Sequence, residues 1–454
     1  MREMKDSGVE WLGYVPSAWK NKTLRHLLID RVGGAWGNEP ANENEGTVCL
    51  RIADFAFDKG LFKECALDEL TYRSYTRKQI KKLALREGDI LIEKSGGGEK
   101  TPVGRAVYYD GSYGAVLYAN FMERLRFKSD EINSKFVEYW LRTWYFCRCS
   151  PFYINQTIGI QNIDLTLMLA KEQIFFPLLQ DQYKIADFLD QKCSEIDALT
   201  ADIQAQIETL EEYKKSVITE AVTKGLDPNV EMKDSGVEWI GKIPKGWKVG
   251  RIKNIISILT DYTANGSFAD LARNVSYIDF EGFARLVRLT DLRSDLNNSD
   301  AVYVSEYSYE YLSKSKLFGN EILIANVGAY AGLFCLMPVN KGLCTLGPNM
   351  FLLRTNSKMT FKYFYYTGHS KFVEEQLLHK SQSTAQPKLN KYDVKSTYII
   401  IPSIEEQQVI TDFLDQKCSE IDQTISEKQQ QLETLAEYKK SLIYEYVTGK
   451  REVA

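Results

Sequence analysis

The hydrophobic residues of two long segments recur at helical spacing. In the segment from Ile196 to Val217 the apolar positions are separated by steps of three and four residues, and the segment from Ile421 to Leu442 keeps the same register, with Lys428 at one position of the stripe. A stripe of this kind is typical of an amphipathic helix that packs on another helix through a heptad seam. The predicted helix-pairing positions are Ile196, Leu199, Ile203, Ile207, Leu210, Tyr213, Val217, Ile421, Ile425, Leu432, Leu435, Tyr438 and Leu442.

The two segments have matching limits. Neither contains glycine or proline in its interior, Pro402 and Ser403 suit the start of the second, and Gly225 and Gly449 stand where a helix end is expected. We therefore predict two helices of about 40 residues, each roughly 60 Å long. Because both carry the same seam, we predict that they pair with each other, antiparallel and related by a pseudo-two-fold axis. A coiled coil that dimerises with an outside partner is the alternative.

The chain also repeats itself at about half its length. The ten residues "FLDQKCSEID" occur at 188–197 and again at 413–422, and 12 of 17 positions match between 4–20 and 232–248. A period of about 225 residues is the size of a domain and far longer than a solenoid unit. The repeat divides the chain into a first domain, a first helix, a second domain and a second helix, with the boundaries 1–178, 179–225, 226–402 and 403–454.

Short β-rich segments alternate with Gly and Asn turns in the two domains. "EGDILIEKSGG" in the first domain matches "GNEILIANVGA" in the second, and "MERLR" matches "MFLLR". The two longer motifs both place an acidic residue and Ile-Leu-Ile before a loop that contains glycine. We predict an α+β fold with a curved sheet in each domain and leave the order of the strands open.

Composition is that of an ordinary globular protein, with 44% hydrophobic and 26% charged residues. No apolar run is long enough for a membrane span, the opening "MREMKDSGVEW" has no signal-peptide core, and the eight scattered cysteines indicate reduced thiols. We therefore expect a location in the cytoplasm. The net charge of −4 hides a pattern, because the two domains carry +2 and +4 while each predicted helix segment carries −5. Domains that lean basic are compatible with nucleic-acid binding.

A search for catalytic chemistry finds no supported site. "SGGGEKT" from Ser95 to Thr101 imitates a phosphate-binding loop, but Glu99 stands where such a loop needs glycine before its lysine. No dinucleotide-binding glycine pattern follows a strand, and the three histidines and eight cysteines form no metal-ligand spacing. We predict neither a catalytic residue nor a metal site.

Several motifs together resemble a known family. The opening "WLGYVPSAWK", the loop "EKSGGGEKTPVGR", and the run from "STAQPKLNKYDV" to "IIIPSIEEQQVITDFLDQK" at the start of a long helix are similar to the specificity subunits of type I restriction–modification systems. The first copy departs from the second at Gln180 and Asp181, which stand in place of Glu405 and Glu406. The resemblance covers essentially the whole chain, and it implies that the cytoplasm in question is that of a bacterium or archaeon.

The resemblance implies a division of labour. Residues 1–178 and 226–402 would be two target recognition domains, separated by two long antiparallel spacer helices, and each domain would read one half of a bipartite asymmetric DNA target. The helices would set the gap between the half-sites and dock two modification (methyltransferase) subunits, and restriction (endonuclease and translocase) subunits join some such complexes. S-adenosylmethionine, ATP and Mg²⁺ would belong to these partner subunits, so that the chain holds no cofactor and is not an enzyme by itself.

Polar side chains in two loop regions of each domain are the candidate DNA contacts. Arg and Lys pair with guanine, Asn and Gln pair with adenine, and small polar or basic side chains bind phosphate. The candidates in the first domain are Lys94, Ser95, Lys100, Thr101, Arg105, Asn155, Gln156, Thr157 and Gln161. Those in the second domain are Asn326, Tyr330, Gln382, Ser383, Thr384, Gln386 and Lys388.

Two other functions stay open at this point. One is a DNA-modifying enzyme with an unrecognised active site, which binding of S-adenosylmethionine by the isolated chain would favour. The other is a structural coiled-coil scaffold, which retention on DNA in low salt, lost as salt rises, would argue against.

Overall fold

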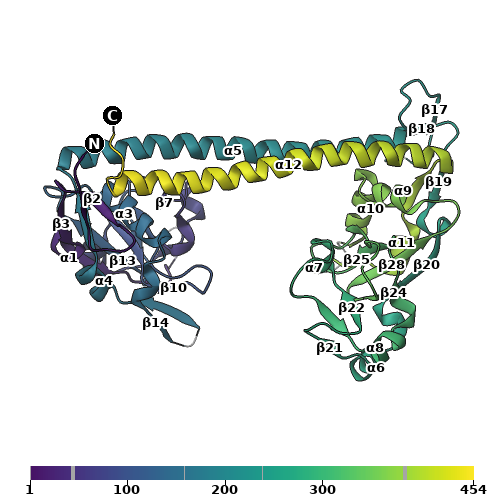
Figure 1. The fold of residues 1–454 in the computed structure, drawn as a ribbon, viewed down its shortest axis with the longest axis horizontal. Helices are drawn as coiled ribbons and strands as arrows, with labels where there is room; N and C mark the ends of the chain where they lie inside the picture. The colour runs from purple at the N-terminus through teal and green to yellow at the C-terminus, as the bar shows by residue number, and fades with distance from the viewer. Residues whose placement is uncertain (1, 42–45, 158, 238, 382–385, 454) are drawn as a thin grey trace. The chain divides into compact units, whose positions relative to one another are not determined.

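The computed structural model describes residues 2–41, 46–157, 159–237, 239–381 and 386–453. The chain forms two compact units, unit 1 from residues 1–204 and 430–454 and unit 2 from residues 205–429. Two long helices contribute to both units (Figure 1), α5 (Leu179–Lys224) and α12 (Ile404–Val447). In the described part of the chain, no helix combines the length and the apolar character that crossing a membrane requires.

Unit 1 contains the elements that precede α5 in the chain. Its strands are β1 (Met4–Asp6), β2 (Tyr14–Pro16), β3 (Lys20–Thr23), β4 (Leu28–Gly33), β5 (Thr47–Leu50), β6 (Phe55–Ala56), β7 (Leu61–Phe62), β8 (Tyr72–Arg73), β9 (Ile90–Glu93), β10 (Ser95–Gly96), β11 (Ala106–Tyr108), β12 (Leu117–Tyr118), β13 (Met122–Phe127), β14 (Ile154–Thr157), β15 (Ile160–Ile163) and β16 (Gln173–Phe176). Its shorter α-helices are α1 (Leu24–Leu27), α2 (Arg77–Leu83), α3 (Ser134–Phe146) and α4 (Leu165–Lys171).

Unit 2 contains the elements between α5 and α12. Its strands are β17 (Met232–Asp234), β18 (Lys242–Pro244), β19 (Lys248–Arg251), β20 (Ile256–Asp261), β21 (Tyr277–Ile278), β22 (Ala284–Val287), β23 (Val302–Val304), β24 (Lys316–Leu317), β25 (Ile322–Ala325), β26 (Phe334–Leu336), β27 (Cys344–Leu346), β28 (Met350–Thr355) and β29 (Tyr398–Ile401). Its α-helices are α6 (Phe268–Asn274), α7 (Leu289–Leu292), α8 (Glu306–Tyr311), α9 (Phe361–Gly368), α10 (Lys371–Ser381) and α11 (Lys391–Ser396).

The two units repeat one sheet plan. The central sheet of unit 1 has the order β11-β9-β13-β4, that of unit 2 has the order β20-β28-β25-β26, and every pair in both is antiparallel. A register shift interrupts β13/β4 in unit 1 and the equivalent β20/β28 in unit 2, and such irregularities bend a sheet. A second sheet in each unit contains one parallel pair, β12/β5 or β22/β27. The predicted α+β class and internal repeat are confirmed.

The acidic residue before each Ile-Leu-Ile strand has the same partner in both units. Asp89 lies 2.7 Å from Arg126, the last residue of "MERLR", and Glu321 lies 3.1 Å from Arg354, the last residue of "MFLLR". Both carboxylates are almost completely buried. A buried carboxylate needs a cation and hydrogen bonds to offset the loss of water, which explains why these short motifs recur although the domains otherwise differ.

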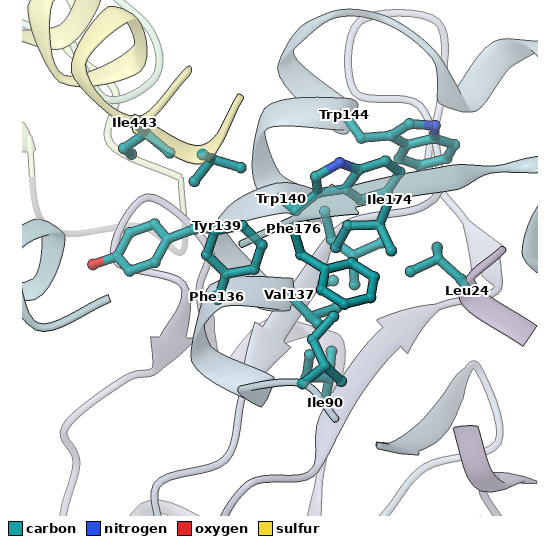
Figure 2. Close-up of a cluster of buried hydrophobic side chains, with 14 of the residues drawn as sticks. Leu24, Ile90, Phe136, Val137, Tyr139, Trp140, Trp144, Ile174, Phe176 and Ile443 are labelled. Atoms are coloured by element: carbon teal, nitrogen blue, oxygen red, sulfur yellow. The ribbon is translucent and has the colours of Figure 1, made fainter. Parts of the chain in front are cut away.

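The main core of unit 1 lies between the central sheet, α3 and the long helices. Figure 2 shows the aromatic side chains of α3, among them Trp140 and Trp144, grouped with Ile90 of β9, Phe176 of β16 and Ile443 of α12. Unit 2 builds the same core with the end of α5, since Ile218 and Val222 are buried in its cluster. Each compact unit is therefore completed by the C-terminal end of the helix that follows the other domain in the sequence.

Within each unit the two long helices run antiparallel. In unit 1, Asp197 lies 2.6 Å from Lys439, and the rings of Phe188 and Tyr446 have centroids 4.5 Å apart. In unit 2, Lys214 lies 2.6 Å from Asp422, and Lys428 donates a hydrogen bond to Gln206. The two ion pairs are the same contact displaced by 225 residues, which confirms the predicted antiparallel pairing.

Two buried glutamines position the start of each long helix. Gln182 accepts a hydrogen bond from the amide of Asn133 at the start of α3 and donates to the carbonyl of Pro177. Gln407, 225 residues later, accepts from the amide of Thr360 and donates to the carbonyl of Pro402. Each glutamine also donates to one further carbonyl, that of Glu131 or Lys358, so it satisfies three backbone groups and fixes the long helix against the helix of its own domain.

The helices α3 and α9 differ at one pair of equivalent positions. Tyr139 of α3 donates to Asp190 and Tyr366 of α9 donates to Asp415, which aligns the two helices. The neighbouring pair is then the buried Glu138 with Arg142 in unit 1, and the half-buried Tyr365 with His369 in unit 2, where the ring centroids lie 4.6 Å apart. The same framework thus holds a charged pair in one unit and an aromatic pair in the other.

Burial of His369 makes unit 2 sensitive to acid. The ring nitrogen Nε2 lies 3.0 Å from the carbonyl oxygen of Phe334, and burial lowers the pKa of His369 to about 4. A lowered pKa means that the unfolded chain binds the proton first, so the contribution is complete above about pH 6.5 and is lost as the pH falls through about 4. We expect wild type to lose about 3 kcal/mol more than His369→Gln over this range, measured by urea unfolding at each pH. Parallel profiles for the two proteins would contradict this expectation.

Candidate nucleic-acid interface

In unit 1 the glycine loop after β9 pairs with a segment from much later in the chain. Strands β10, β15 and β14 form a small antiparallel sheet, in which Ser95 lies opposite Asn162 and Gly96 opposite Gln161. The Ser95 hydroxyl donates to Oδ1 of Asn162 over 2.6 Å. In the view of Figure 1, β14 lies on the side of unit 1 away from α5. The structure thereby brings together the two loop regions that the sequence singled out in this domain.

The glycine loop needs its unusual backbone conformation in order to pack against itself. Gly97 has a φ of +66°, and a Cβ there would come within 2.6 Å of the amide nitrogen of Val103. The same amide donates to Oε1 of Gln161, which is buried. Gly97 is therefore required for the loop to fold back on itself, and Gln161 helps to hold it in place.

The cations predicted for this loop have different surroundings. Nε and Nη2 of Arg105 donate to the two carboxylate oxygens of Glu93, at 2.9 and 3.1 Å, and this hydrogen bonding to the buried carboxylate raises the pKa of Arg105. Lys100 and Thr101 are exposed, whereas Lys94 and Ser95 are half-buried. Arg105 therefore has a structural partner inside the domain, and Lys100 has its ammonium group at the surface. A DNA contact by any of them stays a prediction.

The second predicted loop region of unit 1 is only partly described. Asn155 is exposed on β14, opposite Asn162 of β15. Gln156 and Thr157 pair through their backbones with Gln161 and Ile160, and their side chains lie outside the described part of the structure. Asn155 therefore places a side-chain amide at the exposed surface of β14.

Unit 2 has an equivalent arrangement at the end of β25. Val327 forms a bridge with Lys388, and the amide of Leu389 donates to the carbonyl of Asn326 over 2.9 Å. In unit 1 the amide of Ile163 makes the same contact with the carbonyl of Lys94 over 3.0 Å. The two loop regions therefore meet at the same place in both domains, although Asn326 replaces Lys94 and Lys388 stands opposite the loop in place of Asn162.

A groove in unit 2 runs past this junction. It has a volume of about 750 Å³, and its polar lining includes Asn326, Asn349, Lys388 and Asn390. Oδ1 of Asn326 is sheltered from solvent and has no hydrogen-bond partner in the described part of the protein. Lys388 is exposed. Amide and ammonium groups are the donors and acceptors that can pair with base edges, so these side chains are candidates for base contacts.

The remaining candidates of unit 2 are placed unevenly. Tyr330 is half-exposed, with the guanidinium carbon of Arg293 4.0 Å from its ring centroid, and Gln386 is exposed. Gln382, Ser383 and Thr384 lie outside the described residues. Sequence reasoning missed Asn349 and Asn390 of the groove. A signal for Asn390 was present, because it stands immediately before α11 and caps it.

The predicted helix-pairing positions differ in exposure. Leu199, Tyr213 and Tyr438 are about half-exposed. The positions that are buried or half-buried are Ile196, Ile203, Ile207, Leu210, Val217, Ile421, Ile425, Leu432, Leu435 and Leu442. The partner helix thus covers a narrower stripe than the apolar pattern marks out, and the exposed three lie at its margin.

Comparison with known proteins assigns the family. A model described as the type I restriction modification DNA specificity domain matches residues 62–209 and 244–434. The chain is 24% identical over 385 residues to the type I restriction enzyme MjaVIII specificity subunit of Methanocaldococcus jannaschii, covering 82% of this chain and 81% of that protein. It is 23% identical over 327 residues to the type I restriction enzyme EcoBI specificity subunit of Escherichia coli, covering 68% and 65%.

A solved structure supports the fold. It comes from work on complex assembly and conformational transition of the type I R-M system, and it matches 96% of this chain and 99% of its own with a TM-score of 0.68 and 13% identity. At that identity the likeness bears on the fold alone. The family model, however, matches more than half of the chain and does so once in each repeat, so this chain belongs to the type I restriction modification DNA specificity family.

Proposed function

We propose that this chain is the sequence-recognising subunit of a type I restriction–modification complex, in which each domain reads one half of a bipartite, asymmetric target in duplex DNA. The observation that carries the proposal is that the two domains share their buried ion pairs but differ in the residues at the junction of their loops. The ion pairs Asp89–Arg126 and Glu321–Arg354 repeat the frame, whereas the loop junction differs, with Ser95–Asn162 in one domain and Val327–Lys388 in the other. Two domains with the same internal ion pairs and different loop residues are suited to reading two different half-sites.

The long helices are proposed to set the gap between the half-sites and to dock two copies of one modification (methyltransferase) subunit. The repeated ten-residue segment supports this, because its identity extends to side chains that do not pack. Gln191, Ser194 and Glu195 are exposed in the first copy, as are their counterparts Gln416, Ser419 and Glu420 in the second. Burial explains the identity of the apolar positions, while identical exposed side chains suggest two contacts with the same kind of partner.

The chemistry of modification and cleavage is proposed to reside in partner subunits. The chain itself would be non-catalytic, and S-adenosylmethionine, ATP and Mg²⁺ would be held by the modification subunits and, where present, the restriction subunits. Direct binding of S-adenosylmethionine by the isolated chain would instead favour a modifying enzyme.

Replacement of the first domain tests the division of labour. If residues 21–178 are exchanged for those of another family member, we expect one half of the methylated motif to change while the other half and the gap stay the same. The reason is that the loop junction of unit 2 and its groove are untouched. Methylation-aware sequencing of cells that express the chimera with its modification subunit provides the measurement. Loss of both half-sites in a folded, assembled chimera would contradict the proposal.

A further inference from the structure

Helix α2 of unit 1 carries a dense group of cations that the proposed base-reading loops do not include. Arg77, Lys78, Lys81 and Lys82 lie on the helix and Arg86 follows it, and all five are exposed. Within the described part of the chain, none of the five faces a carboxylate at ion-pair distance. Other arginines of the same domain do have such partners, for example Arg51 with Asp54 and Arg126 with Asp89.

The helix is held firmly, so its cations are presented in a fixed direction. Thr76 and Gln79 form a capping box at its start, and Leu83 is buried at its end. Arg124, itself 2% exposed, donates to the carbonyls of Lys82 and Ala84 and pairs with Asp30. Groups of the same domain therefore satisfy the backbone at both ends of the helix, and its cationic side chains are not needed to hold it in place.

The arrangement of charge on α2 opposes the stability of the helix. Arg77 and Lys81 are four residues apart, as are Lys78 and Lys82, so like charges face one another along the surface. Two of these cations also stand in the first turn, where the helix dipole favours anions. A local arrangement that costs stability without a compensating contact is expected where function requires it.

The equivalent helix of unit 2 shows that the frame does not need these charges. Helix α8 lies between β23 and β25, as α2 lies between β8 and β9, and Ser305 caps it as Thr76 caps α2. It carries Glu306 and Glu310, and Glu310 pairs with Lys316 at 2.7 Å. At this place in the fold, the described residues form a cationic helix in unit 1 and an acidic one in unit 2.

From this geometry we infer that α2 is a phosphate-binding surface that anchors the DNA backbone against the first domain independently of base sequence. The inference rests on the proposed function and adds an element to it. A DNA backbone is the occupant that fits, because interfaces with nucleic acid are strongly cationic and those with protein are depleted in lysine and built on apolar anchors. On α2 the one exposed apolar side chain is Ile80, at 37%.

A charge-neutral variant of the full-length chain tests the inference. We compare wild type with Lys78→Gln/Lys81→Gln/Lys82→Gln, using fluorescence anisotropy on a labelled random-sequence duplex across a KCl series. Each lost phosphate contact flattens the dependence of log affinity on log salt by about 0.9, so three contacts predict a change of about 2.7 and an affinity at least tenfold lower in low salt. The melting temperature should stay equal or rise, because repulsion is relieved.

Two control variants make the result decisive. Lys184→Gln/Lys224→Gln/Lys440→Gln removes three exposed charges from the long helices, and we expect the slope of wild type. Lys78→Arg/Lys81→Arg/Lys82→Arg should also keep that slope, since it preserves the cations. An unchanged slope in the α2 glutamine variant would overturn the inference, as would an equal loss in the long-helix variant. An unchanged slope with weaker binding of the modification subunit would assign α2 to an acidic protein surface. Failure of wild type to bind the duplex would overturn the proposed function as well.

Discussion

Replacement of Arg142 by Met is expected to lower the free energy of unfolding by about 3–5 kcal/mol, because it leaves the carboxylate of Glu138 buried without its cation. The two side chains are 1% and 0% exposed, and Nε of Arg142 lies 3.1 Å from Oε1 of Glu138. Burial raises the pKa of Glu138, whereas the charge of Arg142 lowers it. Removal of the cation therefore takes away the main contribution that offsets the cost of burial. Urea unfolding at pH 7 measures the loss.

The double variant Glu138→Leu/Arg142→Met removes both charges but keeps side chains of similar size. It therefore separates the effect of the ion pair from the effect of filling the space. We expect it to recover most of the stability that Arg142→Met loses, because a buried ion pair is worth little more than apolar side chains of similar size. Unit 2 supports this expectation, since its equivalent positions hold Tyr365 and the neutral form of His369. Arg142 also donates to the carbonyl of Asp58, but Lys439 donates to the same oxygen and remains in the variant. An equal loss in the single and double variants would refute the role of the ion pair.

Insertion of one heptad into both long helices is expected to lengthen the gap of the target without changing its half-sites. The insertions belong after Gln204 and after Gln429, where the two compact units meet in the sequence, so each unit keeps its own helix contacts. Seven residues preserve the seam register and add about 10 Å, close to three base-pair steps of ~3.4 Å. The duplex also turns by about a third of a turn over that length, so activity falls if the readers then face the wrong groove. Methylation-aware sequencing gives the new motif.

The matched control is a four-residue insertion after Gln204 alone. It moves the seam by about half a heptad relative to α12, so buried positions such as Ile207 would lose their partners and the chain should be destabilised. Recovery of the original gap with full activity from the double-heptad variant would show that something other than these helices sets the distance.

The repeat, the fold class and the long helices could be predicted from the sequence because their signals lie in the spacing of nearby residues or in identical stretches of sequence. A helix places every third or fourth residue on one face, so the steps from Ile196 to Val217 report the helix before any partner is known. The identical segments at 188–197 and 413–422 report the two-fold plan in the same direct way. Motifs such as "EGDILIEKSGG" marked strands correctly, since a buried strand must be apolar along its length.

Which side chains are free to bind DNA was decided by tertiary contacts. Arg105 and Lys100 look alike in sequence, yet the fold brings Arg105 to the buried carboxylate of Glu93 and leaves Lys100 exposed. The exposed cations of α2 were overlooked because a run of charge is usually a solvated face, and only the absence of partners within the described structure and the contrast with α8 distinguish it. Apolar spacing likewise cannot tell how wide a stripe the partner covers, which is why Leu199, Tyr213 and Tyr438 are about half-exposed.

The sequence by itself determined that the chain contains two copies of one plan joined by paired helices, because helical periodicity and identical segments can be read directly from the order of the residues. Only the tertiary structure decided that each compact unit is finished by the far helix, with Ile443 and Val447 of α12 in the core of unit 1 and Ile218 and Val222 of α5 in that of unit 2. Those contacts join residues hundreds of positions apart in the first unit. Their energy comes from burial of apolar surface, which depends on shape and leaves no spacing rule in the sequence.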